Sequence, residues 1–230
     1  GVRNLEREIG SLCRKGARVM VEEELKSVSV DAADIAKYLG KRKFIDDAIA
    51  NRNLVGVTNG LAYTEVGGDM LKGEVLIVDG SGKIELTGTL GDVMKESAHI
   101  AVTYIRAHCR EFGIAPDFYK TKDIHIHVPE GAVPKDGPSA GVTMTTSLVS
   151  ALSGIPVRRD IAMTGEITLT GRVLAIGGLR EKSTAAYTMG IRRILIPRDN
   201  MRDMDELDKI IVSEVTFVPC DTLDDVLKEA

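Results

Sequence analysis

The most constraining feature of the sequence is a loop rich in glycine and proline at residues 130–142, which reads EGAVPKDGPSAGV. It connects an alternating, strand-like stretch at residues 124–128 to a run of helix-forming residues at 140–152. Gly137 tolerates a positive φ, and Pro138 fixes φ near the value of a first helical turn. Ser139 is therefore expected at the N-terminal end of a helix, directly after a sharp turn of the backbone.

Two interpretations of Ser139 are open at this point. As a nucleophile, it would lie where unpaired amides and the positive end of the helix dipole favour an oxyanion on an attacked carbonyl. As a structural residue, it would only cap the helix. Asp136 precedes Ser139 by three residues. We expect this carboxylate to cap or brace the loop instead of completing a catalytic triad.

A candidate base lies in a second glycine-rich stretch, GGLREKSTAA at residues 177–186. Paired glycines precede a short helix that contains Lys182 and that Gly190 can end. A neutral lysine can take the proton of a serine, but its pKa must then fall from about 10.4 to about 7.5. Burial among apolar neighbours can supply the roughly 4 kcal/mol that this requires. The alternative is an ordinary solvated lysine on an amphipathic helix.

The rest of the chain divides into two predicted units. A helical apolar stripe covers residues 4–21, and a second helix at 32–39 is bounded by Asp31 and Gly40, so residues 1–50 are expected to form a small all-helical appendage. From residue 51 to 230, alternating strands and helices predict an α/β domain with a mixed, α+β-like sheet. Within it we expect a strand at 54–58, a hairpin of 73–78 with 83–87, and a long helix at 91–111.

Six stretches of the sequence together resemble the proteolytic domain of bacterial ATP-dependent Lon proteases. PKDGPSAG around Ser139, MTGEITL at residues 163–169 and GGLREK ending at Lys182 stand in the order and spacing of that family. GLAYTEVGGD at 60–69, LGDVMKESA at 90–98 and DIHIHVPEGA at 123–132 extend the resemblance over the chain. The resemblance implies the Lon proteolytic fold and a serine endopeptidase that uses a dyad of Ser139 and Lys182.

The resemblance also implies supporting residues around this dyad. Thr164 would lie beside it and hydrogen-bond Lys182, unless it is an ordinary β-branched strand residue. Glu166 would tune the charge of the lysine, although a surface carboxylate is the default. His125 and His127 project from one face of a strand, but no third ligand is spaced to join them, so we expect no metal. We assign the two histidines to orienting the serine loop.

A protease that accepts many sequences is expected to bind its substrate by backbone hydrogen bonds along an exposed strand edge. The best candidate is the stretch at residues 61–66. Tyr63 differs from the larger aromatic residue expected in many relatives, which puts the shape of its pocket in question. The predicted substrate-binding residues are Leu61, Ala62, Tyr63, Thr64, Glu65 and Val66.

The N-terminal helix resembles the end of the helical subdomain of the Lon ATPase module. This resemblance implies a nucleotide-sensing role for Arg3, which is otherwise a solvated arginine. No phosphate-binding loop of the type G-x-x-x-x-G-K-[ST] occurs in the sequence. We therefore expect no cofactor for this part of the protein and cleavage without ATP consumption, whereas ATP and Mg²⁺ are implied for the full-length protein.

Charge and cysteine content limit the other partners. The net charge of −4 gives no reason to expect nucleic acid or an anionic membrane as the main partner. Three widely spaced cysteines favour reduced thiols and a cytoplasmic location, and neither a signal peptide nor a long apolar run is found. The resemblance implies unfolded or damaged proteins as substrates, a role in protein quality control under stress, and a hexameric ring for the full-length protein.

Two further functions stay open from the sequence. One is a catalytically silent Lon-like domain that serves as an assembly scaffold; such a domain would be expected to lose the serine or the lysine, and both are present. The other is a hydrolase that acts on small amides. A comparison of activity on an unfolded protein with activity on a small amide would distinguish such a hydrolase from a peptidase.

Overall fold

The computed structural model describes residues 2–41, 52–64, 67–129 and 134–230. The chain divides into two compact units, Gly1–Asp47 and Ala48–Ala230. The predicted boundary between residues 50 and 51 lies outside the described residues. No helix of the described part is both long and apolar enough to span a lipid bilayer.

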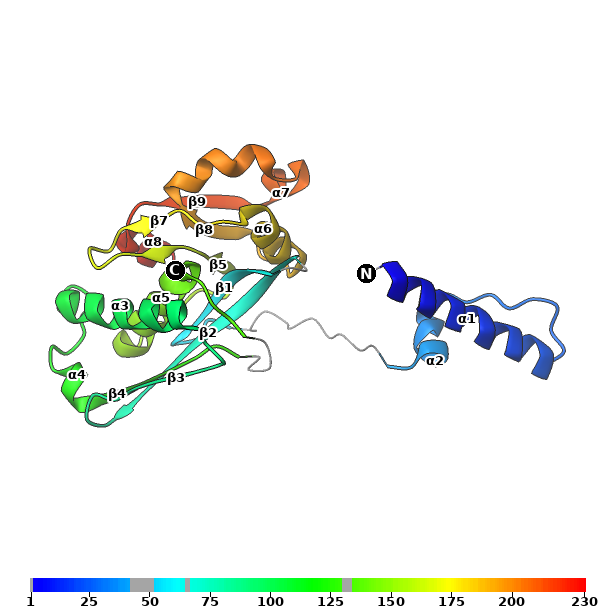
Figure 1. The fold of residues 1–230 in the computed structure, drawn as a ribbon, viewed down its shortest axis with the longest axis horizontal. Coiled ribbons are helices and arrows are strands. Elements are labelled where there is room, and N and C mark those ends of the chain that lie inside the picture. The colour runs from blue at the N-terminus through cyan, green and yellow to red at the C-terminus, as the bar shows by residue number, and fades with distance from the viewer. Residues whose placement is uncertain (1, 42–51, 65–66, 130–133) are drawn as a thin grey trace. The chain divides into compact units, whose positions relative to one another are not determined.

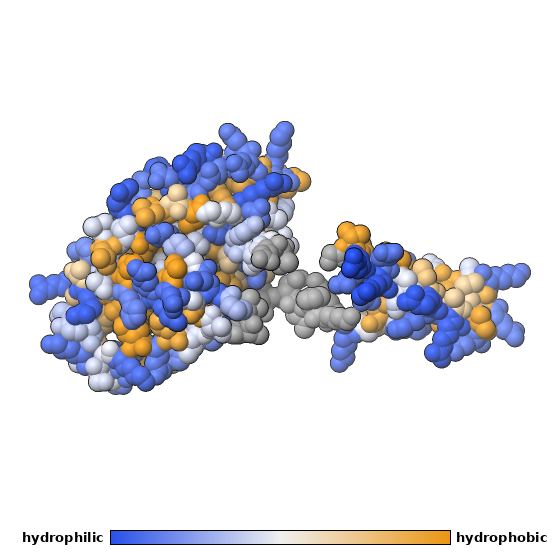
Figure 2. All heavy atoms as spheres, viewed as in Figure 1, coloured by the Kyte–Doolittle hydropathy of each residue, from blue (hydrophilic) through white to orange (hydrophobic). Residues whose placement is uncertain are grey.

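Within residues 2–41, the regular elements of the first unit are all helical, as predicted. It contains helix α1 (Val2–Glu22), a 3₁₀ turn η1 (Ala32–Asp34) and helix α2 (Ile35–Leu39), which ends at Gly40 with a φ of 88°. The Lys15 ammonium donates a hydrogen bond of 2.6 Å to the Tyr38 carbonyl and so ties α1 to α2. Apolar residues appear on the surface of this unit as orange spheres among blue ones (Figure 2). Val2 and Leu5 are among its exposed large apolar residues.

The second unit is built on a seven-stranded mixed sheet, which confirms the predicted fold class. Its strand order is β3-β4-β2-β1-β5-β8-β9, and a separate pair of short strands, β6 and β7, forms a second sheet (Figure 1). The strands are β1 (Val57–Thr64), β2 (Gly67–Asp79), β3 (Ile84–Thr87), β4 (Lys122–His127), β5 (Ile161–Met163), β6 (Glu166–Ile167), β7 (Val173–Leu174), β8 (Arg193–Pro197) and β9 (Thr216–Cys220).

Helices cover both faces of this sheet, and strand alternation determines which helix packs on which face. On β5, Ile161 and Met163 belong to the core shared with α3, α5 and α8, whereas Ala162 belongs to the core shared with α6 and α7. The helices are α3 (Asp92–His108), α4 (Phe118–Thr121), α5 (Gly141–Ser153), α6 (Leu179–Thr188), α7 (Lys209–Glu214) and α8 (Leu223–Glu229), with 3₁₀ helices η2 (Pro138–Ala140) and η3 (Arg198–Glu206).

The predicted hairpin of residues 73–78 with 83–87 is wrong. Strand β4 lies between β2 and β3, antiparallel to β2 and parallel to β3. The connection at residues 80–83 is therefore not a β-hairpin turn. Its amides, from Ser81, Gly82 and Lys83, donate hydrogen bonds to the Asp123 carboxylate on β4. The true hairpin partner of β2 is β1, which pairs with it from Val57 to Thr64.

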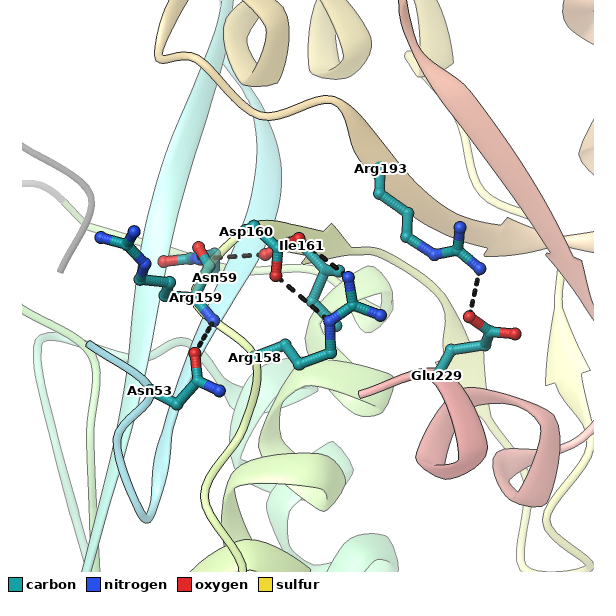
Figure 3. A network of polar contacts seen from close by, with 8 residues as sticks. All are labelled: Asn53, Asn59, Arg158, Arg159, Asp160, Ile161, Arg193 and Glu229. Carbon is teal, nitrogen blue, oxygen red and sulfur yellow. Dashed lines mark hydrogen bonds and ion pairs between the residues drawn. The ribbon is translucent and has the colours of Figure 1, made fainter. Parts of the chain in front are cut away.

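The predicted strand at residues 54–58 is also displaced. Leu54 forms only an isolated bridge to Val157, and β1 begins at Val57, after Gly56 adopts a φ of 73°. Asn59 on β1 is buried, and its amide donates hydrogen bonds to the carbonyls of Arg159 and Ile161 (Figure 3). This side chain therefore fastens β1 to the beginning of β5.

Helix α6 approaches the β1–β2 hairpin at a glycine. A Cβ atom added at Gly68 would lie 2.0 Å from the Glu181 carbonyl oxygen, a distance that real Cβ atoms do not reach. The backbone of β2 and the backbone of α6 are therefore in direct contact. Only glycine permits this approach.

We predict that Gly68→Ala lowers the free energy of unfolding by about 1–3 kcal/mol, because the added methyl group meets backbone and not a flexible side chain. Urea denaturation measures this change. Gly177→Ala is the matched control, since a Cβ at Gly177 would have no atom within 4 Å. Equal stability of Gly68→Ala and Gly177→Ala would contradict the close contact of β2 with α6.

Candidate active site

Ser139 lies in the 3₁₀ turn η2, immediately before helix α5. The turn begins at Gly137, whose φ is 130°, and it closes with a hydrogen bond from the Gly141 amide to the Pro138 carbonyl. The expected helix at 140–152 is found one residue later, at Gly141–Ser153. Ser139 is thus at the N-terminal end of this helical segment, as the sequence predicted, and it is partly exposed.

The serine turn is held by the chain that follows β5. The Gly165 amide donates to the Ser139 carbonyl at 2.9 Å, and the Val142 amide donates to the Gly165 carbonyl at 3.0 Å. The Thr164 amide in turn donates to the Leu195 carbonyl on β8 at 3.2 Å. The position of Ser139 is therefore fixed by the sheet and not only by its own loop.

Lys182 is a buried lysine on helix α6. Gly178 starts this helix with a φ of 70°, and its carbonyl accepts the Lys182 amide at 3.0 Å. The Lys182 residue is 2% exposed. Burial lowers the pKa of its amine to about 8 from the usual 10.5. About a tenth of the amine is thus neutral at pH 7, against less than a thousandth at the usual pKa, and the neutral form is what a general base requires.

Thr164 connects the lysine to the serine turn. Its hydroxyl accepts a hydrogen bond of 3.2 Å from the Lys182 amine and lies 3.4 Å from the Ser139 carbonyl, to which it donates. Thr164 is itself 1% exposed. Because a neutral amine that donates one proton to Thr164 keeps its lone pair, this contact sets the direction of the lysine without consuming its basicity.

Ser139 and Lys182 line one pocket of about 810 Å³. No direct hydrogen bond between their side chains is found in the described structure, and such bonds often tighten only when a substrate is present. The walls of the pocket come from β1, the serine turn and the segment before α6. They include Leu61, Ala62, Tyr63, Thr64, Leu71, Met94, Asp136, Gly137, Pro138, Ala175, Ile176, Gly177, Gly178 and Glu181.

Asp136 braces the serine turn, as expected. Its carboxylate accepts the amide of Gly137 at 2.9 Å and the amide of Met94 at 3.1 Å. Met94 lies in the first turn of α3, so Asp136 supplies an acceptor for that helix N-terminus. The carboxylate therefore joins the serine turn to α3.

The histidines and Glu166 do not reach the two candidate catalytic residues. His125 and His127 both contact the Thr87 hydroxyl on β3, at 2.9 and 2.7 Å, and neither lines the pocket. They share the sheet face opposite Ile124 and Ile126, which point into the core. Neither histidine has a hydrogen bond or ion pair to the described part of the serine loop, residues 134–139, so their assignment to orienting that loop stays a prediction. The described residues contain no cluster of three or more metal-ligating side chains.

Glu166 lies on β6, where it pairs with Leu174, and it is not part of the pocket wall. Burial lowers the Lys182 pKa, and no contribution from Glu166 is found in the described part of the chain. Arg3 is exposed on α1 in the first unit.

The predicted substrate-binding strand is only partly described. Leu61, Ala62, Tyr63 and Thr64 line the pocket, whereas Glu65 and Val66 lie outside the described residues. Strand β1 pairs with β2 along its whole length, but its other edge pairs with β5 only at Gly60. Beyond this pair, the edge of β1 borders the pocket.

Sequence reasoning missed the part of the pocket wall that residues 175–178 form. It also missed Asn200, which is fully buried and holds that wall from behind. Asn200 is 24 residues from its partner Ile176 in the sequence. Asparagine in a polar 3₁₀ segment gives no signal of such a contact.

Comparison with known families gives two matches that together cover the chain. Residues 29–230 match the Lon protease (S16) C-terminal proteolytic domain, and residues 1–28 match the Lon protease AAA+ ATPase lid domain.

Similar proteins include the Lon protease of Geobacter metallireducens, 54% identical over 230 residues, and that of Finegoldia magna, 54% identical over 229 residues. Lon protease 1 of Bacillus subtilis is 51% identical over 230 residues. Each alignment covers all of this chain but only 28%, 30% and 30% of the respective relative. The chain thus spans under a third of the length of these proteins.

We predict that Lys182→Met raises the free energy of unfolding by about 3 kcal/mol at pH 7, because it removes an ammonium whose burial is unfavourable. Between pH 8 and 10.5 the unfolded wild-type chain binds more protons than the folded one, so wild-type stability rises with pH. The advantage of the variant should shrink over this range. Denaturant titrations across pH measure it.

Lys209→Met is the matched control, since Lys209 is exposed at the start of α7. This variant should show no comparable change in stability between pH 7 and 10.5. A stability difference between Lys182→Met and wild type that stays constant over the same range would show that the Lys182 pKa is not lowered.

Proposed function

The chain belongs to the Lon protease family and contains its C-terminal proteolytic domain, and we propose that it cleaves peptide bonds with Ser139 as nucleophile and Lys182 as base. One observation carries the assignment of these two residues. A lysine that is 2% exposed, with a pKa of about 8, lines the same pocket as a serine at a helix N-terminus. A buried ammonium is unfavourable for folding, so its retention is best explained by chemistry.

In the proposed reaction, the neutral Lys182 amine takes the proton of the Ser139 hydroxyl while Oγ forms a bond to the substrate carbonyl carbon. The carbonyl oxygen becomes an oxyanion at the N-terminal end of the helical segment, where amides and the helix dipole favour negative charge. The Lys182 ammonium then donates its proton to the leaving amine as the peptide C–N bond breaks. Water releases the acyl group from Ser139 with Lys182 again acting as base.

Thr164 is proposed to position the lysine amine during both steps. It holds Lys182 through one hydrogen bond and is anchored to the sheet through its own amide. Asp136, Gly137 and Pro138 are proposed to shape the serine turn. These roles rest on contacts and not on chemistry at the reacting atoms.

For the full-length protein, we propose unfolded or damaged proteins as substrates, ATP and Mg²⁺ as cofactors of the ATPase module, a hexameric ring and a cytoplasmic location. The match of residues 1–28 to an ATPase lid supports the use of ATP. Arg3 is proposed to sense the nucleotide there. An open pocket bordered by a strand edge supports extended, unfolded substrates.

We predict that Ser139→Ala, Lys182→Ala and Lys182→Arg each lower kcat/KM for casein cleavage by roughly a thousandfold or more. The arginine variant fails because a guanidinium stays protonated at working pH. Circular dichroism and denaturant titration should show that all three variants remain folded. If the Ser139→Ala protein still cleaved casein at the wild-type rate, Ser139 could not be the nucleophile.

The same preparations distinguish a peptidase from a small-amide hydrolase. A peptidase should cleave casein and extended peptides with much higher kcat/KM than a single-residue amide, since the pocket wall along β1 contributes binding only to longer chains. Preferential hydrolysis of the small amide would favour the alternative.

We predict that Thr164→Val lowers kcat for peptide cleavage by about tenfold, because it removes the hydrogen bond from the lysine amine to the threonine hydroxyl while keeping the side-chain shape. Thr164→Ser is the matched control and should keep most of the activity, since it retains the hydroxyl. Steady-state kinetics measure both. Equal rates for the valine and serine variants would contradict the positioning role.

A further inference from the structure

Asn200 makes an unusual pair of contacts at the back of the pocket wall. This residue, on η3, has no exposed surface. Its side-chain carbonyl accepts the Ile176 amide at 3.0 Å, and its side-chain amide donates to the Ile176 carbonyl at 2.8 Å. A third hydrogen bond of 2.6 Å, from this amide to the Asp203 carboxylate, fixes which end of the Asn200 side chain is which.

The two hydrogen bonds from Asn200 to Ile176 determine how the backbone of residues 175–177 is oriented. One planar amide can reach both the N–H and the C=O of a single residue only when that residue is extended, so that both groups point to the same side. The chain contains no cis peptide bond among the described residues. In a trans peptide the C=O and N–H point in opposite directions. The carbonyl of Ala175 and the amide of Gly177 must therefore point away from Asn200.

The side to which they point is the pocket. Ala175 and Gly177 both line it together with Ser139 and Lys182. Among the described residues, neither the Ala175 carbonyl nor the Gly177 amide has a hydrogen-bond partner. The edge of β1 borders the same pocket, and Tyr63 on β1 lies next to Gly178, which follows this segment. A backbone acceptor and a backbone donor thus point into a pocket that also contains the candidate nucleophile and the edge of a strand.

We propose that Asn200 is a positioning residue for substrate: by holding both backbone groups of Ile176 behind the wall, it presents the Ala175 carbonyl and the Gly177 amide to an extended peptide lying between this segment and β1. The proposal rests on the proposed peptidase function and adds a second backbone partner for its substrate. Such an arrangement reads the peptide backbone and is independent of side-chain sequence.

Peptide binding to the Ser139→Ala protein tests this proposal without requiring catalysis. A labelled, unstructured casein peptide is titrated by fluorescence anisotropy against the 230-residue chain carrying Ser139→Ala, alone and with Asn200→Ala. We expect the second substitution to raise Kd by about tenfold or more, because two backbone partners lose their fixed direction.

Asn59→Ala in the same Ser139→Ala background is the matched control. Asn59 is also a buried asparagine that hydrogen-bonds two backbone groups, but it lies outside the pocket wall. Asn59→Ala should lower the free energy of unfolding and leave Kd within about twofold of the Ser139→Ala parent. Binding is measured at a temperature at which every variant is folded.

Peptides methylated at one backbone nitrogen separate positioning from a merely structural role. In the Ser139→Ala parent, methylation of the nitrogen that pairs with the Ala175 carbonyl should raise Kd by about tenfold. With Asn200→Ala added, the same methylation should cost less than about threefold, since that bond is already impaired.

The outcomes distinguish the two proposals. An unchanged Kd in Asn200→Ala, or a methylation cost equal in both backgrounds at every position, overturns the role of Asn200. Loss of the proposed peptidase function would instead appear as casein cleavage that does not depend on Ser139, and it would leave the binding result readable. A Kd raised only in Asn200→Ala, with a methylation cost that disappears there, supports the proposal.

Discussion

The burial of the Lys182 amine is the constraint on which the rest of the site depends. At 2% exposure, the ammonium form is disfavoured and the pKa falls to about 8. This environment requires that helix α6 pack tightly on the β1–β2 hairpin, which the contact of Gly68 with the Glu181 carbonyl allows. It also leaves Thr164 as the side chain to which the amine donates. A looser packing of α6 would admit water and return the lysine to its ordinary, protonated state.

The serine and the lysine are brought together from opposite faces of the sheet. Helix α5, which follows the serine turn, packs in the core shared with α3, whereas α6 packs in the core shared with α7. They meet beyond the end of β5, where Thr164 contacts the lysine and Gly165 binds the Ser139 carbonyl. The carboxyl ends of parallel strands are where open α/β sheets commonly place their sites. Thr164 and Gly165, which follow β5, thus hold the serine turn and helix α6 next to each other, although α5 and α6 pack in different cores.

The sequence allowed the local features to be predicted, because glycine, proline and helix-forming residues act over a few positions. The turn before α5, the helix that carries Lys182 and the all-helical first unit were found in this way. Strand pairing was not, since the insertion of β4 between β2 and β3 depends on residues about 40 positions apart, such as Asp123 and Ser81. The same limit explains why the contacts of His125 and His127 with Thr87, and the role of Asn200 behind Ile176, were missed.

The central claim is that burial makes Lys182 a base near neutral pH, and its ionisation can be observed directly. Lysine enriched with ¹³C at the ε-carbon gives an NMR signal for each side chain, and Lys182→Arg identifies the one of interest. The account predicts that this signal titrates with a midpoint at about 8, as burial of the amine requires. A midpoint at the ordinary lysine value of about 10.5 would contradict it.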